Sequence, residues 1–321
     1  MSGSRMVALT LALAAVAATP AAAQSYPSRT ITMVVAFPAG GYADTFARVL
    51  ADRLGAKLGQ TVVVENRGGA GGNIGAGTVA HATADGYTLL ATTASVAVNE
   101  TYYKNKNFTA AADLRAIAIP AGAPESLSVA PNDPIKNLAE LVQAGRTKPF
   151  NYANPGVGTS SHVAAAFFFK TLAKIDPVPV PFQGGAPAVN AVLGGHVQVL
   201  VGTLPGYAGP ISSGQLRGLA VASEQRVPGF TNIPTYSEGG YPGFVAETWV
   251  GVFAPAKVDD AIAQKLNAAI NAVVSEPQTQ ARLAKLSMQT RVRSLPDTEA
   301  YFRSEMAKWG KMVEAIGIVA K

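Results

Sequence analysis

The sequence predicts an α/β protein with two similar lobes, each with a central β-sheet flanked by helices, and a cleft between them. Two observations support this prediction. Short β-branched, apolar segments alternate with amphipathic segments and glycine-rich turns, which is typical of parallel strands joined by helical crossovers. A Pro131-Asn-Asp-Pro134 turn then separates this series from a second one. The 321 residues, 48% of them hydrophobic, are enough for two cores of ordinary size.

The first series begins with segment 30–37, whose apolar and β-branched residues indicate a strand buried on both faces. A turn through Gly40 and Gly41 leads into a helix that we expect to reach about Lys57 and to end at Gly59. Strands 61–65 and 87–91 follow, and a glycine-rich turn and a helix lie between them. The order β-α-β-α-β predicts parallel strands.

The second series repeats this pattern, and a helical C-terminal region follows it. In the second series we expect strands at 127–130, 150–153, 178–182, 197–201 and 216–222, and helices at 138–144, at 163–170 with Thr159 or Ser160 as the cap, and from 186 onwards. Segments 258–274 and 298–316 carry apolar residues at helical spacing. We interpret both as helices that pack on a core.

Composition and charge exclude several classes of function. Charged residues make up 14% of the chain, too few for a disordered or coiled-coil protein. Without cysteine there is no disulfide, thiolate nucleophile or cysteine-bound metal. The net charge of +6 comes from scattered Lys and Arg residues, so we expect no nucleic-acid partner.

The N-terminus has the pattern of a cleaved export signal. Arg5 precedes an apolar run at 7–19, and the alanines at 21–23 fit the small-residue cleavage rule. The sequence therefore predicts a signal peptide at 1–23, a mature chain that begins at Gln24 and, in a bacterium, a periplasmic location.

Motifs for cofactors, metals and catalysis are missing. The glycine-rich segment 68–77 lacks the G-x-G-x-x-G spacing of a dinucleotide site and the lysine of a phosphate-binding loop. No metal-ligand spacing occurs either. Ser161 and His162 are adjacent, but neighbouring residues on a helix do not face each other, and no G-x-S-x-G elbow is present. We expect no cofactor, no metal and no catalytic residue.

Small polar residues follow the predicted strands at their carboxyl ends, where ligands bind in parallel α/β sheets. The groups are 39–41 and 92–95 in the first series, and 158–161, 183–185 and 202–203 in the second. They offer backbone N–H and hydroxyl donors without a fixed positive charge, and several such bonds can hold a carboxylate. Alternatively, they are ordinary turn residues, a common role of Gly, Ser and Thr.

Asp44 bears on this hypothesis because it lies in the first turn of the helix that follows Gly41. We expect its carboxylate to meet free backbone N–H groups there. That would place a negative charge at the helix end proposed for the ligand, so hydrogen bonds from the turn would have to outweigh it.

Seven segments of the mature chain resemble, in family order, the Bug-type solute-binding receptors of tripartite tricarboxylate transporters. They are Phe37-Pro-Ala-Gly-Gly41 with Asp44, 64–75 (VENRGGAGGNIG), 85–90 (DGYTLL), 158–162 (GTSSH), 184–188 (GGAPA) with 193–195 (LGG), 216–221 (LRGLAV) and 249–255 (WVGVFAP). The resemblance implies a type II periplasmic-binding-protein fold. It also implies that a monomer closes on a small carboxylate and docks on membrane permease subunits.

The same resemblance implies the domain limits and the site. Lobe I would comprise 24–128 and 247–321, and lobe II would comprise 129–246. In that family the first-lobe turn and loop hold one carboxylate, partly through ordered waters. The implied ligand-binding residues are Phe37, Ala39, Gly40, Gly41, Tyr42, Ala43, Thr92, Thr93 and Ser95 in lobe I, and Gly158, Thr159, Ser160, Ser161, Phe182 and Thr203 in lobe II.

Two departures from the family pattern narrow the expected ligand. Tyr42 and Ala43 stand where a small hydroxyl residue is common, and the Gly202-Thr203 turn lacks an acidic or amide residue. We find no carboxylate placed to meet an ammonium group, so the sequence favours a mono- or dicarboxylate over an amino acid. Tyr42 and Phe182 could flank an aromatic acid. The alternative functions are a ligand-sensing partner of a membrane sensor kinase and a hydrolase that uses Ser161 or His162.

Overall fold

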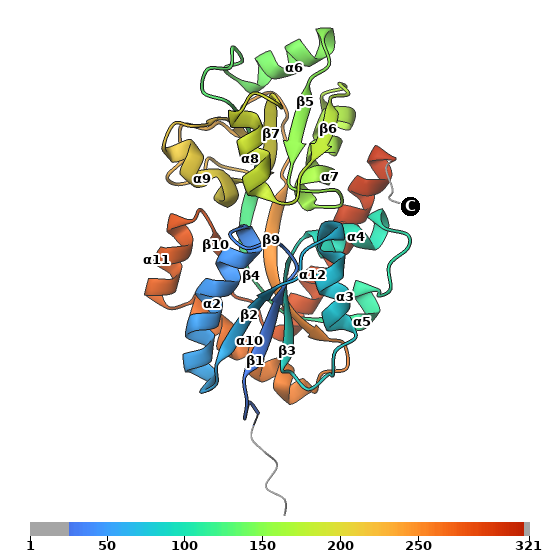
Figure 1. Cartoon of the computed structure of the whole chain (residues 1–321), viewed down its shortest axis with the longest axis vertical. Helices are drawn as coiled ribbons and strands as arrows, with labels where there is room; N and C mark the ends of the chain where they lie inside the picture. Colours follow the sequence, from blue (N-terminus) through green and yellow to red (C-terminus); the bar gives the residue numbers. More distant parts are fainter. Residues whose placement is uncertain (1–25, 318–321) are drawn as a thin grey trace, which may run out of the picture.

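The computed structural model describes residues 26–317, in which two α/β parts lie above and below a pair of long strands (Figure 1). The predicted signal peptide at 1–23 lies outside these residues. In the described chain ten strands follow the order β2-β1-β3-β9-β4-β7-β5-β6, and β8 and β10 also pair with β4. The strands are β1 (Ile31–Val35), β2 (Val62–Asn66), β3 (Thr88–Thr93), β4 (Leu114–Val129), β5 (Asn151–Asn154), β6 (Val178–Pro181), β7 (Val199–Thr203), β8 (Arg217–Val221), β9 (Glu247–Pro255) and β10 (Gln289–Thr290).

Strand β4 belongs to both parts of the molecule. Its residues from Leu114 to Pro124 pair antiparallel with β9, whereas those from Glu125 to Val129 pair with β7 and β8. The partner changes between Pro124, which faces Glu247, and Glu125, which faces Thr203. We call the strands paired below this point the lower sheet and those paired above it the upper sheet.

In the lower sheet the predicted parallel β-α-β-α-β series is present. β1 pairs in parallel with β2 and β3, and β3 pairs antiparallel with β9. The upper sheet has parallel pairs β5–β6 and β5–β7. Each sheet has apolar layers on its faces; Met33, Phe46 and Ile270 are fully buried in the lower part, and Leu200 and Leu204 in the upper part.

Helices cover both sheets and mostly begin at the predicted signals. They are α2 (Tyr42–Leu58), α3 (Asn73–Ala80), α4 (Ser95–Tyr102), α5 (Ala110–Asp113), α6 (Leu138–Thr147), α7 (Ser160–Ala166), α8 (Gly185–Leu193), α9 (Leu204–Ser212), α10 (Asp260–Val274), α11 (Pro277–Lys285) and α12 (Leu295–Ile316), with short η1 (Ala70–Gly72) and η2 (Phe167–Leu172). Gly59 ends α2 in the left-handed region with φ 72°, and the Thr159 hydroxyl caps α7 by accepting from His162 N–H.

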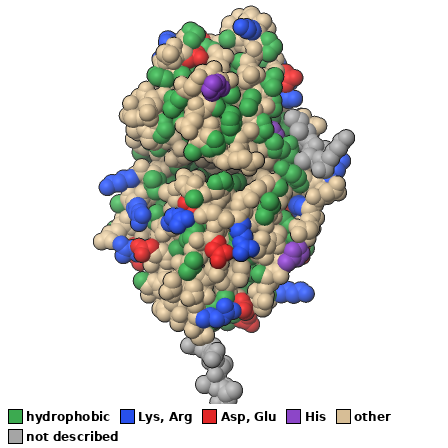
Figure 2. All heavy atoms as spheres, in the orientation of Figure 1, with side chains coloured by type: hydrophobic (Ala, Val, Ile, Leu, Met, Phe, Trp, Pro, Cys, Tyr) green, Lys and Arg blue, Asp and Glu red, His purple; other side chains and the backbone are tan. Residues whose placement is uncertain are grey.

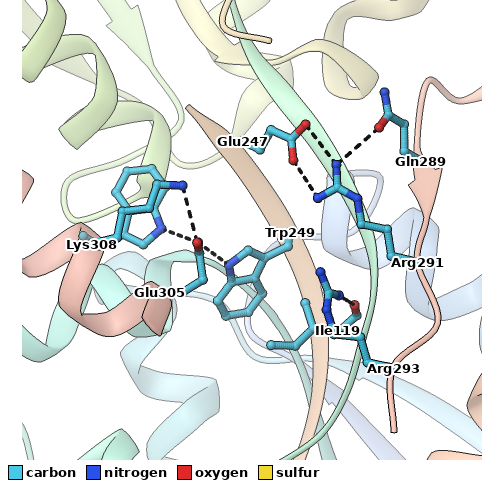
Figure 3. Close-up of polar contacts among 9 residues, drawn as sticks. Ile119, Glu247, Trp249, Gln289, Arg291, Arg293, Glu305 and Lys308 are labelled. Carbon is cyan, nitrogen blue, oxygen red and sulfur yellow. Dashed lines mark hydrogen bonds and ion pairs between the residues drawn. The ribbon is translucent and has the colours of Figure 1, made fainter. Parts of the chain in front are cut away.

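A buried carboxylate joins the C-terminal helix α12 to β9. Glu305 is 5% exposed, and its Oε2 accepts hydrogen bonds from the indole N–H groups of Trp249 (2.9 Å) and Trp309 (3.1 Å). Figure 3 shows Glu305 between Trp249 and Lys308, and in the same region Arg291 facing Glu247. Since α12 also packs on α4, α7 and η2, this contact fixes a helix that reaches from the lower part to the upper part.

We predict that Glu305→Met lowers the free energy of unfolding by about 2–4 kcal/mol, because it leaves two buried indole donors without an acceptor. Glu305→Gln has a side chain of similar length that keeps one acceptor oxygen, so this variant should lose much less stability. Urea unfolding of both variants measures the difference. Equal stability of the methionine variant and the wild type would contradict the role given to Glu305.

Candidate functional site

A cavity of about 220 Å³ lies between the lower and upper parts, beside the start of β9. Figure 2 shows the hollow between the two parts on one face of the molecule. The lower wall consists of Phe37, Pro38, Ala39, Gly40, Gly41, Tyr42, Ala43, Thr93, Ser95 and Thr248. The upper wall consists of Pro155, Thr159, Ser160, Ser161, Gln183, Gly184, Gly185, Ala186, Pro187, Thr203, Gly206 and Tyr207. None of these lining residues carries a formal charge.

The N-terminus of α2 opens into the lower wall. Gly41 is the N-cap, and no described residue accepts a hydrogen bond from the backbone N–H of Tyr42 or Ala43. These donors are first-turn groups that a 17-residue helix cannot satisfy internally, and they lie at the positive end of its dipole. The helix therefore offers an anion two backbone donors at the cavity wall.

Asp44 holds the turn that precedes α2, as the sequence predicts. Its Oδ2 accepts from Gly40 N–H at 2.8 Å, and its Oδ1 accepts from Asn66 Nδ2 at 2.8 Å. Arg48 Nε donates to the same carboxylate. Burial by itself would raise the pKa of Asp44, but the hydrogen bonds from Arg48, Gly40 and Asn66 outweigh it and lower that pKa. The Gly40 N–H is therefore used within the protein, which leaves the Tyr42 and Ala43 donors for a ligand.

The junction between β3 and α4 contributes hydroxyl groups that reach the upper wall. Thr93 Oγ1 donates to Ser95 Oγ at 2.9 Å, and Ser95 Oγ also accepts from Ser160 N–H at 3.2 Å. The last bond joins α4 and α7, which come from opposite sides of the cavity. Ser95 is thus both a lining residue and a direct link between the two walls.

A buried carboxylate lies behind the serines of the upper wall. Glu125 Oε1 accepts from Ser160 Oγ at 3.0 Å, and its Oε2 accepts from Ser161 Oγ at 2.7 Å. Glu125 is 5% exposed, and this burial raises its pKa to about 7, although the serine hydrogen bonds lower it somewhat. The sequence reasoning that found no carboxylate placed to meet a ligand ammonium group did not anticipate Glu125, which does not line the cavity but lies one hydroxyl group away from it.

Aromatic rings form the apolar part of the wall. Tyr42 is 8% exposed, and its hydroxyl has no partner among the described residues. Burial raises the pKa of Tyr42, so its hydroxyl stays neutral. Tyr207 lies opposite, at the start of α9, and its hydroxyl donates weakly to the Val201 carbonyl at 3.3 Å. Phe37 completes this apolar lining.

Of the fifteen residues expected at the site, three do not line this cavity. Phe182 lies in an adjoining groove with Phe37 and Tyr103, so it does not face Tyr42 across the cavity. Thr92 is buried in β3. Gly158 packs against Tyr103 and Asn99, and a Cβ there would lie 2.8 Å from Asn99 Oδ1. The other twelve come together at the cavity.

Sequence reasoning missed Glu125, Thr248 and Tyr207. Glu125 lies within β4, and Thr248 lies near the start of β9. A search limited to the carboxyl ends of strands does not find either residue. Tyr207 lies on α9, a helix that begins with a proline in its first turn and contains Pro210. The Gly and Pro residues of this segment are typical of a turn, so nothing in the sequence indicated that the Tyr207 side chain would line a cavity.

The serine and histidine considered for catalysis do not form a pair. Ser161 Oγ donates to Glu125, and His162 turns away to contact Tyr102 edge-on with ring centroids 5.6 Å apart. Burial lowers the pKa of His162 to about 4, so the imidazole is neutral. Within residues 26–317 no group of three acidic or histidine side chains could hold a metal, and no helix has the length and apolar character to cross a bilayer.

Comparison with known proteins explains this architecture. Residues 46–318 match the model of the TctC family, described as the tripartite tricarboxylate transporter family receptor. The chain belongs to this receptor family. Its members are binding proteins, so the receptor is not an enzyme, and the predicted family and its α/β periplasmic-binding-protein fold are both confirmed.

Three solved structures resemble the receptor over almost their whole length. Rpa4515 from R. palustris, solved with adipate, is 31% identical with a TM-score of 0.88, covering 92% of this chain and 99% of that one. MatC from Rhodopseudomonas palustris, solved with bound malate, is 30% identical with a TM-score of 0.84 (90% and 100% covered). The periplasmic binding protein BugD is 31% identical with a TM-score of 0.86 (92% and 100% covered).

We predict that Asp44→Asn destabilises the receptor by about 1–3 kcal/mol at pH 7, because charge-assisted hydrogen bonds at the turn are lost. The lowered pKa means that the carboxylate stabilises the fold above its unfolded-state pKa, and that this contribution is lost as the pH falls through the native pKa. The stabilities of Asp44→Asn and the wild type should therefore converge in acid.

Urea midpoints at pH 7 and in acid measure this prediction. Asp52→Asn is the matched control, since Asp52 is exposed on the same helix α2. A loss of stability that is equal for the two variants, or independent of pH, would contradict the role of Asp44.

Proposed function

We propose that the receptor captures a small mono- or dicarboxylate, aromatic acids included, and delivers it to the membrane permease subunits of a tripartite tricarboxylate-type transporter. The observation that carries the proposal is the cavity wall, which presents the free backbone N–H groups of Tyr42 and Ala43 at the N-terminus of α2. These are donors without a fixed charge. Adipate and malate, bound by the two relatives, are carboxylates of the proposed size.

Hydrogen bonds from uncharged donors are strong enough for the affinity of a transport receptor. Each charge-assisted hydrogen bond contributes about 1.5–3 kcal/mol. Four of them would contribute roughly 6–12 kcal/mol, a range that includes the roughly 8 kcal/mol of micromolar binding, before the entropy cost of association is subtracted. Without a salt bridge the ligand can also be released, as delivery to a permease requires.

We further propose that binding closes two lobes, 24–128 with 247–321 and 129–246. The change of partner on β4 after Pro124 supports this division. Contacts between the two proposed lobes support closure: Ser160 N–H meets Ser95 Oγ at 3.2 Å beside the cavity, and Tyr103 OH meets the Val157 carbonyl at 3.4 Å in the adjoining groove. The proposal also includes export to the periplasm by the signal at 1–23 and action as a monomer.

A ligand panel tests the proposed function. Thermal shift and calorimetry with adipate, malate and benzoate should find at least one tight ligand, and solution scattering should show a smaller radius of gyration once that ligand saturates the receptor. An amine-bearing compound such as an amino acid as the sole tight ligand would overturn the carboxylate proposal. An unchanged radius would overturn closure.

We predict that Gly158→Ala weakens carboxylate binding at least tenfold. Gly158 has φ 76°, and an added Cβ would overlap the ring of Tyr103, which belongs to the other proposed lobe and lines the adjoining groove, so the clash opposes closure. Gly195→Ala is the matched control, because Gly195 has φ 71° with no atom within 4 Å of the added Cβ.

Both alanine variants should lose about 1–2 kcal/mol of stability from the left-handed backbone. Only Gly158→Ala should lose affinity for adipate, malate or benzoate in calorimetry. Equal affinities of the two variants would show that the Gly158 contact is not part of ligand-induced closure.

A further inference from the structure

The two serines that face the cavity share their protons with Glu125. Ser160 Oγ and Ser161 Oγ lie 3.0 Å and 2.7 Å from separate oxygens of its carboxylate. A hydroxyl has one proton to donate. When Glu125 is ionised it accepts from both serines, and their oxygens then present only lone pairs to the cavity. A ligand carboxylate, itself an acceptor, cannot use them in that state.

Protonation of Glu125 reverses one of these hydrogen bonds. A protonated carboxyl is one donor with its remaining acceptor capacity intact. Glu125 can then donate to Ser161 Oγ, which frees the Ser161 proton to point at a ligand, while Ser160 still donates to the other oxygen. Ser160 also lies 2.9 Å from Thr248 Oγ1, so a third hydroxyl is part of the same network. Each proton taken up thus adds one donor to the cavity.

Charge balance also favours the protonated state of Glu125. The cavity wall includes no Lys, Arg or His side chain among its described residues. An ionised Glu125 would face the ligand anion across a single hydroxyl, and two carboxylates that share a site do not both remain ionised. The nearby guanidinium of Arg291 is already paired with the Glu247 carboxylate at 2.9 Å.

The groups around Glu125 leave it as the residue that titrates. They are Tyr42 on α2, Tyr207 on α9, Tyr236 before β9, Glu247 on β9 with its partner Arg291, Arg217 on β8 and His162 on α7. Burial raises the pKa of each of the three tyrosines, so they stay neutral. The Glu247 carboxylate is paired with Arg291 at 2.9 Å, and the pKa of His162 is lowered to about 4. Arg217 donates to backbone carbonyls at the far end of β8.

We propose that the receptor binds its carboxylate ligand together with one proton, which is taken up from solvent by Glu125 and turns Ser161 into a donor to the ligand. This inference rests on the proposed function and specifies the chemistry of that site. The free Glu125, with its pKa near 7, is poised between the two states at neutral pH. An anion in the cavity raises that pKa further, so affinity falls above pH 7 and is nearly constant below it.

The experiment is calorimetry of the wild-type receptor with the tightest of adipate, malate and benzoate. Their carboxyl groups are ionised at pH 7 and above. At pH 8, buffers of different ionisation enthalpy should report uptake of close to one proton per ligand. Between pH 7 and pH 9 the Kd should rise by up to tenfold per pH unit.

Glu125→Gln imitates the protonated state, since its amide donates to one serine and accepts from the other. We expect no proton uptake by this variant and a Kd that changes less than about threefold from pH 6 to pH 9. Glu247→Gln is the control, because it removes the carboxylate opposite Pro124 and should keep the wild-type pH dependence.

The wild-type buffer series decides the question even if Glu125→Gln does not fold. Tight binding with no proton uptake and a flat pH profile would overturn this inference and leave the proposed function intact. Affinity that rises with pH would also overturn it, because an ionised Glu125 would then be favoured by the ligand. Failure of every carboxylate to bind would instead overturn the proposed function, and this inference with it.

Discussion

The pairing of β4 with both sheets is the constraint on which the site depends. On both of its edges this strand changes partners, from β9 and β10 below to β7 and β8 above. The continuous backbone prevents the lower and upper parts from sliding past each other, so the closure that we propose has to be a bending or twisting of β4 where it changes partners. The cavity lies beside this point, where a small rotation changes the distance between its walls.

The anion site that we propose has no cation among the described residues of its wall, and the neighbouring turn shows how the charge of Asp44 is balanced. Asp44 satisfies Gly40 N–H and is itself balanced by Arg48, so the acidic residue adds structure to the turn without presenting an uncompensated charge. The first-turn N–H groups of Tyr42 and Ala43 remain as donors. A ligand held by dipoles and hydroxyls avoids the desolvation of a buried ion pair, and release then needs no separation of opposite charges.

Local patterns predicted the elements whose signals are local. The β-branched run at β1, the Gly59 cap and the Thr159 cap each express a preference of one or two residues, and each prediction is confirmed. The first part of β4 was missed because its Ala, Gly and Pro residues, including Pro120 and Pro124, are poor strand formers. The structure accommodates this segment through register shifts between Ala116 and Ala121 and through partners on both sides. Tertiary pairing overrides propensity there, and so the position of Glu125 could not be derived from the sequence.

Two buried carboxylates illustrate what the sequence cannot distinguish. Asp44 receives hydrogen bonds from a guanidinium, the NH₂ group of an amide and a backbone N–H, groups that can only donate, so its charge is fixed and its pKa is lowered. Glu125 receives hydrogen bonds only from hydroxyls, which rotate and can equally accept, and burial raises its pKa. The type of donor, more than the depth of burial, therefore decides whether a carboxylate fixes a turn or exchanges a proton. Only the folded chain brings Ser160 and Ser161 to Glu125 across 35 residues, so the proton-exchanging role arises from the fold itself.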